Sequence, residues 1–238
     1  MPQAFIKEIF YSIQGEGQYA GSPMYFVRFC DCNLNCSYCD TDFTRADKCQ
    51  IECLPGSKEY DCLPNPLSPE QLLAALKKIR SSTTTKVVSL TGGEPLLQGA
   101  FLREVLPQLK RAGYGIHLET NGTFPQELTT VIQDIDVVAM DIKIEKFNDQ
   151  GFIDQQEAFL KIAVAKEAFV KIVIDDNVEY LTQAIDLIAK TANVPVFFQP
   201  KDKTSLSPAA LQDLQAEGLK KLENVRIIPQ LHKTLKIK

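Results

Sequence analysis

Three cysteines stand close together near the N-terminus, at Cys32, Cys36 and Cys39, with three and then two residues between them. The chain contains seven cysteines, an odd number, and disulfides rarely persist in a reducing compartment. A zinc site usually takes a fourth ligand, and an ordinary 4Fe-4S cluster takes four cysteines. Three thiolates around such a cluster would leave one iron with an open coordination position, which indicates metal-centred chemistry, with a structural zinc knuckle as the alternative.

A second short motif, Thr91-Gly92-Gly93-Glu94-Pro95, follows the apolar run at 86–90. A Gly-Gly-X-Pro sequence by itself is a plausible turn. Other polar residues also directly follow apolar runs: Thr120-Asn121-Gly122, Lys143 and Gln199-Pro200. If these runs are parallel strands, their carboxyl ends meet at one edge, where ligands bind in α/β folds.

The elements that would position these residues alternate along the chain. Short β-branched or aromatic runs predict strands at 24–29, 86–90, 115–119, 136–142, 169–174, 194–198 and 225–229. Helical periodicity predicts helices at 69–80, 101–112, 154–167, 178–192 and 207–223. Ser68-Pro69 and Ser207-Pro208 each place an N-cap residue before proline. This order predicts one α/β sheet or barrel of parallel strands.

The composition excludes several classes of protein. The 238 residues carry 26 basic and 30 acidic side chains, a formal charge of −4, which argues against a nucleic-acid or membrane-surface protein and favours a small substrate. No apolar run is long enough for a membrane span and the N-terminus lacks a secretory pattern, so we expect a cytoplasmic protein. Residues 44–68 have no convincing period and predict an excursion over the barrel mouth or a partly ordered loop.

The cysteine motif, with Tyr38 before its last cysteine, resembles the signature of radical S-adenosylmethionine (SAM) enzymes, and Gly92-Gly93-Glu94-Pro95 resembles their SAM-binding loop. Within that superfamily the chain resembles the 7-carboxy-7-deazaguanine synthases from end to end, apart from 44–68. The matching segments are 9–17, Gly21, Arg28, 39–41, 119–122, 199–200 and 229–233.

The resemblance implies a partial TIM-type barrel, with residues 1–238 forming a single radical SAM domain into which 44–68 is inserted. It implies ring contraction of 6-carboxy-5,6,7,8-tetrahydropterin to 7-carboxy-7-deazaguanine with release of ammonia, in queuosine and deazapurine biosynthesis. A 4Fe-4S cluster, SAM and Mg²⁺ would be the cofactors. A homodimer and an electron donor such as flavodoxin or ferredoxin would be the protein partners, with no nucleic acid and no membrane.

The resemblance also assigns residues. The cluster would be held by Cys32, Cys36 and Cys39, and Mg²⁺ by Thr41. The pterin would be bound by Ile13, Gln14, Gly15, Glu16, Arg28, Thr91 and Lys238. SAM would be bound by Tyr38, Cys39, Asp40, Gly93, Asp141, Ile142, Lys143, Gln199, Pro200, Lys201 and Asp202.

Other interpretations stay open for several of these residues. Arg28 could form a structural salt bridge instead, Thr41 could be a turn residue, and Glu119 and Asn121 could belong to an ordinary turn. His117 is expected to be packed or hydrogen-bonded rather than catalytic, and Cys30 to be a small packed residue. His232 lies in the matching C-terminal segment, which closes over the substrate in that family, and either a substrate-site role or none remains open.

Two features favour a different radical SAM enzyme, an activating enzyme of a glycyl-radical protein. Asp141-Ile142-Lys143 stands where the synthases more often have Ser-Pro-Lys, and the 44–68 segment adds Cys49, Cys53 and Cys62. The spacing of these three cysteines is not a ferredoxin pattern, so free or weakly zinc-binding thiols are expected.

Overall fold

The computed structural model describes residues 1–39, 41–80, 84–176, 178–201 and 204–237. They form a sheet in the order β10-β9-β8-β7-β6-β5-β2-β1-β3-β4. Its strands are β1 (Ile6–Ile13), β2 (Pro23–Phe29), β3 (Lys48–Glu52), β4 (Tyr60–Pro64), β5 (Val87–Gly92), β6 (Gly115–Thr120), β7 (Val137–Ile142), β8 (Glu167–Ile174), β9 (Val196–Pro200) and β10 (Val225–Ile227). From β2 through β5 to β10 neighbouring strands are parallel, as predicted, whereas β1 runs antiparallel to β2.

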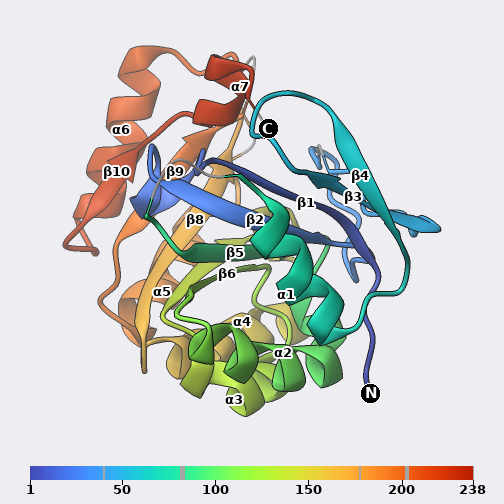
Figure 1. Ribbon diagram of the computed structural model, residues 1–238. Coiled ribbons are helices and arrows are strands. Elements are labelled where there is room, and N and C mark those ends of the chain that lie inside the picture. The colour runs from blue at the N-terminus through green and yellow to red at the C-terminus, as the bar shows by residue number, and fades with distance from the viewer. Residues whose placement is uncertain (40, 81–83, 177, 202–203, 238) are drawn as a thin grey trace.

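The helices are α1 (Pro69–Lys78), α2 (Gly99–Arg111), α3 (Pro125–Val131), α4 (Gln150–Ala163), α5 (Leu181–Thr191), α6 (Pro208–Leu219) and α7 (Leu231–Leu235). Helices α1 to α5 each contact the next, and Figure 1 shows α2, α3 and α4 gathered on one side of the sheet. Ser68 caps α1 through a capping box and Ser207 caps α6, which confirms both predicted N-caps.

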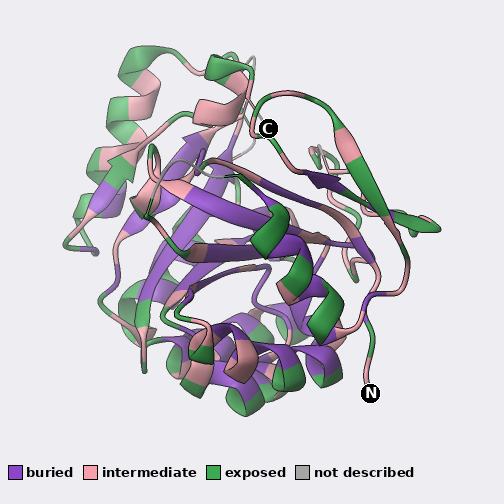
Figure 2. Cartoon of the chain, viewed as in Figure 1, coloured by how far each residue is buried: buried purple, intermediate pink, exposed green. Residues whose placement is uncertain are grey.

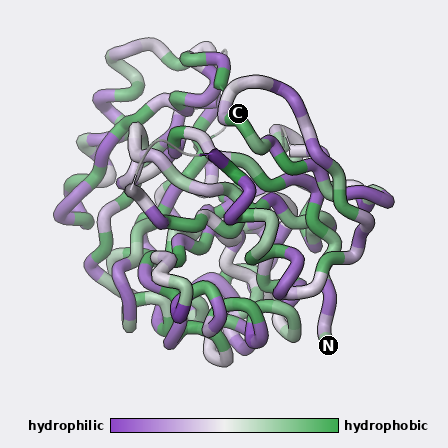
Figure 3. Tube along the Cα trace, in the orientation of Figure 1, coloured by the Kyte–Doolittle hydropathy of each residue, from purple (hydrophilic) through white to green (hydrophobic). Residues whose placement is uncertain are grey.

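The hydrophobic core fills the layer between the sheet and these helices. The parallel strands are mostly buried, and helices α1 to α5 bury the faces that they turn to the sheet, whereas α6 and α7 are largely exposed or half-buried (Figure 2). Along the trace, hydrophobic stretches run through the interior while hydrophilic residues recur at helix surfaces and loops (Figure 3). This is the arrangement of an α/β layer in which each helix buries one apolar stripe. No helix in the described ranges is long and apolar enough to cross a membrane.

Side-chain alternation divides each parallel strand between two environments. In β8, Val170, Ile172 and Ile174 belong to the core under the helices, whereas Lys171 and Val173 line a cavity on the other face of the sheet. Such alternation follows from the two-residue period of a strand. The functional side chains of the sheet are therefore expected at every second position, close to the carboxyl ends of the strands.

The segment 44–68 differs from the prediction of a loop or excursion, because it contributes two strands to the sheet. β3 pairs parallel to β1, and β4 returns antiparallel to β3. Asn65 fixes the segment to β1: its Nδ2 donates to the carbonyl oxygens of Ile6 and Ala46, both at 2.9 Å. Burial of Cys49 and Ile51 anchors β3 in the main core, while β4 is largely exposed.

Candidate active site

A cavity of about 660 Å³ opens at the carboxyl ends of β2, β5, β6, β7 and β8. It is large enough for a cofactor and a small substrate together. Fifteen of the residues assigned by the sequence line it: Ile13, Gln14, Gly15, Glu16, Arg28, Cys32, Cys36, Tyr38, Cys39, Thr41, Thr91, Gly93, Asp141, Lys143 and Lys201. Asp40, Asp202 and Lys238 lie outside the described residues.

The three cysteines of the motif follow β2 in one loop and line the same cavity. Cys32 is held from two sides, since its Sγ accepts from the Leu34 amide at 3.4 Å and lies 4.0 Å from Asn121 Nδ2. In the described part of the chain no three side chains of metal-ligating type are gathered as a finished metal site. The fit to an iron–sulfur cluster therefore rests on the donor set: three cysteine thiols in one loop, all of which line the cavity.

Hydrogen bonds tie the cysteine loop to the end of β6. Asn121 Nδ2 donates to Asn33 Oδ1 at 2.9 Å, and Asn33 Nδ2 donates to Thr123 Oγ1, also at 2.9 Å. Thr123 Oγ1 in turn donates to Asn121 Oδ1 at 2.6 Å. The sequence left open whether Asn121 is an ordinary turn residue; in the structure it both forms the turn and bridges two loops.

The Gly-Gly-Glu-Pro loop lies directly against the cysteine loop. A Cβ on Gly93 would lie 1.8 Å from the Asp31 carbonyl oxygen, so only glycine permits this approach. The next residue, Glu94, is buried, and its carboxylate accepts from Thr120 Oγ1, Asn121 N and Leu96 N at 2.8 to 3.1 Å. Burial raises the pKa of Glu94 to about 7, although these hydrogen bonds oppose the shift.

Several buried polar atoms have no partner among the described residues: Tyr38 Oη and Asp141 Oδ1, whose residues line one side of the cavity, and both amide atoms of Gln199, which does not line it. The ammonium groups of Lys143 and Lys201 lie 5.2 and 5.8 Å from the Tyr38 ring centre, and Lys143 Nζ is 2.8 Å from Asp141 Oδ2. Buried polar groups without partners mark a place for a polar ligand. These residues therefore fit a zwitterionic, nucleoside-bearing cofactor such as SAM.

Three of the residues assigned to SAM do not reach the cavity surface. Ile142 belongs to the core under the helices, because it alternates with Asp141 in β7. Gln199 is fully buried in β9 and Pro200 is half-buried at its end; neither lines the cavity. A contact from Ile142 to a ligand in the cavity would have to come from its backbone.

Two ion pairs lie in the part of the cavity around Arg28. Its Nε is 2.8 Å from Glu8 Oε1, so the salt bridge considered in the sequence is present, and its Nη1 is 3.4 Å from Thr41 Oγ1. Lys7 Nζ donates to Asp42 Oδ2 at 2.6 Å and so holds the loop that carries Thr41. The planar guanidinium suits a ligand carboxylate.

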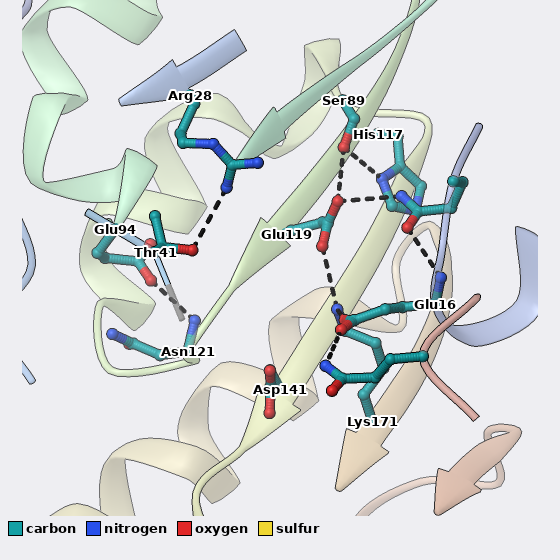
Figure 4. A network of polar contacts seen from close by, with 12 residues as sticks. Glu16, Arg28, Thr41, Ser89, Glu94, His117, Glu119, Asn121, Asp141 and Lys171 are labelled. Carbon is teal, nitrogen blue, oxygen red and sulfur yellow. Dashed lines mark hydrogen bonds and ion pairs between the residues drawn. The ribbon is translucent and has the colours of Figure 1, made fainter. Parts of the chain in front are cut away.

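A second charged group forms the floor of the cavity and is drawn in Figure 4. Lys171 Nζ lies 2.5 Å from Glu16 Oε2 and 3.0 Å from Glu119 Oε2. Glu119 Oε1 also accepts from Gln14 Nε2 at 3.0 Å and Ser89 Oγ at 2.8 Å. Lys171 was not predicted as a site residue, although it is the one charged residue inside the apolar run 169–174.

His117 lies beneath this floor and does not line the cavity. It is buried, and its Nδ1 is 3.2 Å from Ser89 Oγ, which confirms the expectation of a packed, hydrogen-bonded histidine. Burial lowers its pKa to about 4, despite the nearby Glu119 carboxylate. His117 is therefore neutral at physiological pH.

The C-terminal segment covers the loop of Gly15 and Glu16. The Leu231 amide donates to the Gly15 carbonyl at 2.9 Å, and Gln230 Nε2 donates to Glu16 Oε1 at 2.5 Å. A Cβ on Gly15 would lie 2.3 Å from His232 Nδ1. His232 lines the cavity, together with Lys233 and Lys236.

The remaining cysteines lie away from the cavity and are free thiols. Cys30 and Cys49 are fully buried, so Cys30 is packed as expected. Cys53 is half-buried beside Asp61, and Cys62 is exposed on β4.

A loop of three cysteines after a parallel strand, with a glycine-rich loop packed against it at the carboxyl ends of a partial barrel, defines a class of enzyme. The radical SAM superfamily model matches residues 27–197, and the chain belongs to that superfamily. Within it, the chain belongs to the 7-carboxy-7-deazaguanine synthase family. It is 37% identical to the 7-carboxy-7-deazaguanine synthase of Geobacter sulfurreducens, over 98% of this chain and 97% of the relative.

Other comparisons agree on family and fold. The chain is 34% identical to the 7-carboxy-7-deazaguanine synthase of Methanopyrus kandleri, over 98% of this chain and 93% of that protein. The crystal structure of QueE from Escherichia coli is similar, with a TM-score of 0.62 and 20% identity, and the match covers 97% of this chain and 95% of that chain. The structural similarity supports the predicted α/β partial-barrel fold. Membership of the superfamily implies a 4Fe-4S cluster and SAM as cofactors.

Proposed function

We propose that this protein converts 6-carboxy-5,6,7,8-tetrahydropterin to 7-carboxy-7-deazaguanine and ammonia, as in queuosine biosynthesis. The observation that carries the proposal is the single cavity lined by the three cysteines, Gly93, Arg28 and Glu16. When bound, the cluster and SAM would supply one-electron radical chemistry. The chain itself would bind the substrate at both ends, orient it and exclude water.

The two charged parts of the cavity match the two ends of such a substrate. Arg28 offers N–H donors to its carboxylate, and Glu16 offers carboxylate oxygens to the N–H groups of the pterin edge. The C-terminal segment, docked on Gly15 through the Leu231 amide, covers the loop between them. Cys32, Cys36 and Cys39 would hold the cluster, while Tyr38, Asp141 and Lys143 would hold SAM.

Mg²⁺ at Thr41 belongs to this proposal as well. Thr41 lines the cavity, and a single protein oxygen combined with substrate oxygens and waters suits an ion that gives up water reluctantly. Arg28 Nη1 donates to Thr41 Oγ1 at 3.4 Å, a contact that uses one of the two lone pairs of the hydroxyl oxygen. A homodimer and a flavodoxin or ferredoxin as electron donor are also proposed, from the resemblance alone.

The alternative, activation of a glycyl-radical protein, was suggested by Asp141-Ile142-Lys143. In the structure Asp141 and Lys143 form an ion pair at the cavity, an arrangement that either enzyme could use. The synthases matched over nearly the whole chain favour the pterin reaction.

The test is anaerobic incubation of the reconstituted protein with SAM, a reductant, Mg²⁺ and 6-carboxytetrahydropterin. We expect a product lighter than the substrate by the mass of ammonia, and SAM regenerated at each turnover. A parallel reaction without Mg²⁺ tests the ion separately. If the protein holds an intact cluster and yields no such product, the proposed function is refuted. Stoichiometric consumption of SAM would favour the activating enzyme of a glycyl-radical protein.

A further inference from the structure

Lys171 is the most deeply buried charged group in the cavity floor. Its side chain is 3% exposed, while those of Glu16 and Glu119 are 15% and 14% exposed. It extends from an inward-facing position of β8 between two carboxylates that come from different parts of the chain, the loop after β1 and the end of β6. Burying a charged lysine is costly unless the ammonium is paired, so the two carboxylates are what allow a lysine at this position.

The three groups together carry one net negative charge, because one ammonium faces two carboxylates. Burial alone would raise the pKa values of Glu16 and Glu119, but the adjacent Lys171 ammonium, together with the hydrogen bonds that each carboxylate accepts, keeps both pKa values below the ordinary range. Asp141 is the third carboxylate acting on Lys171, and His117 lies near Glu119. Without the ammonium, two adjacent carboxyl groups could not both ionise easily.

The carboxylates keep accepting capacity toward the cavity. A carboxylate offers about four lone-pair sites. Glu16 uses two of them, for Lys171 and Gln230, and Glu119 uses three, for Lys171, Gln14 and Ser89. About three sites therefore remain on the floor, and all of them are acceptors. Such a surface fits a ligand edge with adjacent N–H donors and disfavours an edge that presents a carbonyl oxygen.

We propose that Lys171 is a positioning residue that sets the ligand preference of the cavity, by holding Glu16 and Glu119 side by side as two ionised acceptors for a 2-amino-4-oxo heterocycle. The inference rests on the proposed function, since it takes the pterin class as the ligand. Lys171 itself need not touch the ligand; it acts through the two carboxylates.

The test compares two stable ligands that differ in one group. Pterin-6-carboxylate carries a 2-amino donor, whereas lumazine-6-carboxylate carries a 2-oxo acceptor at the same position. Affinities are measured by calorimetry on the reconstituted protein with SAM and no reductant, so that no turnover occurs. We expect the unaltered protein to prefer the pterin by about 10- to 100-fold, the cost of leaving a buried acceptor facing another acceptor.

Lys171→Met should reduce this preference to less than about threefold at pH 6, because one carboxyl becomes protonated and then donates a hydrogen bond to the 2-oxo group. The preference should return as the pH rises, within a range in which neither heterocycle ionises. The unaltered protein and Lys171→Arg should keep a preference that does not change with pH. Lys110→Met is the matched control, since Lys110 pairs with Asp136 at the surface, away from the cavity.

If Lys171→Met does not fold, the double variant Lys171→Met/Glu119→Gln keeps the test decisive. It removes one cation and one anion, so the floor retains its net charge, and the remaining Glu16 carboxylate no longer faces a second carboxylate. We expect it to bind both ligands with similar affinity, because only one carboxylate remains. A pterin preference retained in this variant would mean that net charge suffices and that the carboxylate pair has no such role.

Three results would overturn the inference: no preference in the unaltered protein, an unchanged preference in Lys171→Met, or an equal, pH-independent loss of affinity for both ligands, which a purely structural lysine would give. If the unaltered protein converts the tetrahydropterin yet shows one of these results, only the inference fails. If it neither binds nor converts a pterin, the proposed function fails and the inference with it.

Discussion

Asn121 and Asn33 are 88 residues apart in sequence, yet the Nδ2 of Asn121 donates to the Oδ1 of Asn33 at 2.9 Å. This bond links the end of β6 to the cysteine loop, and the same Nδ2 lies 4.0 Å from Cys32 Sγ. Since the Asn121 amide N–H also donates to Glu94, a single residue connects the cysteine loop, the glycine-rich loop and the sheet. The loop that would carry the cluster is thus held before any metal binds.

Asn33→Ala should loosen that connection. The variant loses the hydrogen bonds to Asn121 and Thr123 and leaves the side-chain amide of Asn121 with fewer partners. We expect this loss to lower the free energy of unfolding by about 1–2 kcal/mol. We expect a lower denaturation midpoint of the metal-free protein and faster iron loss from the reconstituted one. Asn35→Ala, an exposed position in the same loop, is the control. Equal behaviour of the two variants would contradict a holding role for Asn33.

Cys36→Ala tests the ligand assignment. Replacing one of three thiolates should abolish both cluster assembly and turnover, because an iron loses its protein ligand. Iron content and the charge-transfer absorption of the reconstituted protein are the measurements. Cys62→Ala removes an exposed thiol on β4 and should load iron normally. A full cluster in Cys36→Ala would show that the motif has been assigned wrongly.

The sequence predicted the strands and helices whose periodicity is undisturbed. Strands β2 and β5 to β10 and helices α1, α2, α4, α5 and α6 lie where the apolar patterns placed them, with ends shifted by a few residues. β1 was not predicted, and a register shift between Ile6 and Glu8 interrupts its alternation. Helices α3 and α7 are too short to show a helical period. β3 and β4 were missed because prolines and glycine flank them closely.

The residues of the candidate site also fall into two groups, those that the sequence could predict and those that only the fold reveals. The cysteines, Gly93 and Arg28 could be found from motifs, because their chemistry demands particular residues at particular spacings. Lys171 stands in no motif, and its meaning depends on Glu16 and Glu119, which only the fold brings to it. The available signal was alternation: within β8, Lys171 shares its face with Val173 and not with Ile172. The same rule would have placed the Ile142 side chain away from the cavity.

The stability of the metal-free protein should depend on pH through His117. Its pKa is about 4 in the folded protein and about 6.5 when unfolded, so between these values the unfolded chain binds more protons. Stability is therefore lost as the pH falls through this window, by about 2 kcal/mol between pH 7 and pH 5. His117→Gln keeps a hydrogen-bonding side chain but cannot titrate.

The check is the difference between the two proteins in urea denaturation midpoints at pH 7 and pH 5. Other groups that titrate in this range, such as Glu94, are common to both and cancel in the comparison. We expect the loss on acidification to be smaller in His117→Gln by that amount. Parallel pH profiles would mean that His117 can be protonated in the folded state without cost.

Gly93→Ala tests the contact between the two loops of the site. Its Cβ would meet the Asp31 carbonyl oxygen at 1.8 Å, and backbone on both sides leaves no flexible side chain to move aside. The glycine-rich loop must then shift away from the cysteine loop, at a cost of about 1–3 kcal/mol. Because Cys32 directly follows Asp31, we expect SAM affinity to fall by about 10-fold or more in the reconstituted protein, at 1.4 kcal/mol per factor of ten.

Gly151→Ala, in the first turn of α4, is the matched control. The atom nearest to the added Cβ is a side-chain oxygen of Asp149 at 3.3 Å, and alanine favours a helix. Wild-type SAM affinity and stability in Gly93→Ala would show that the two loops need not touch.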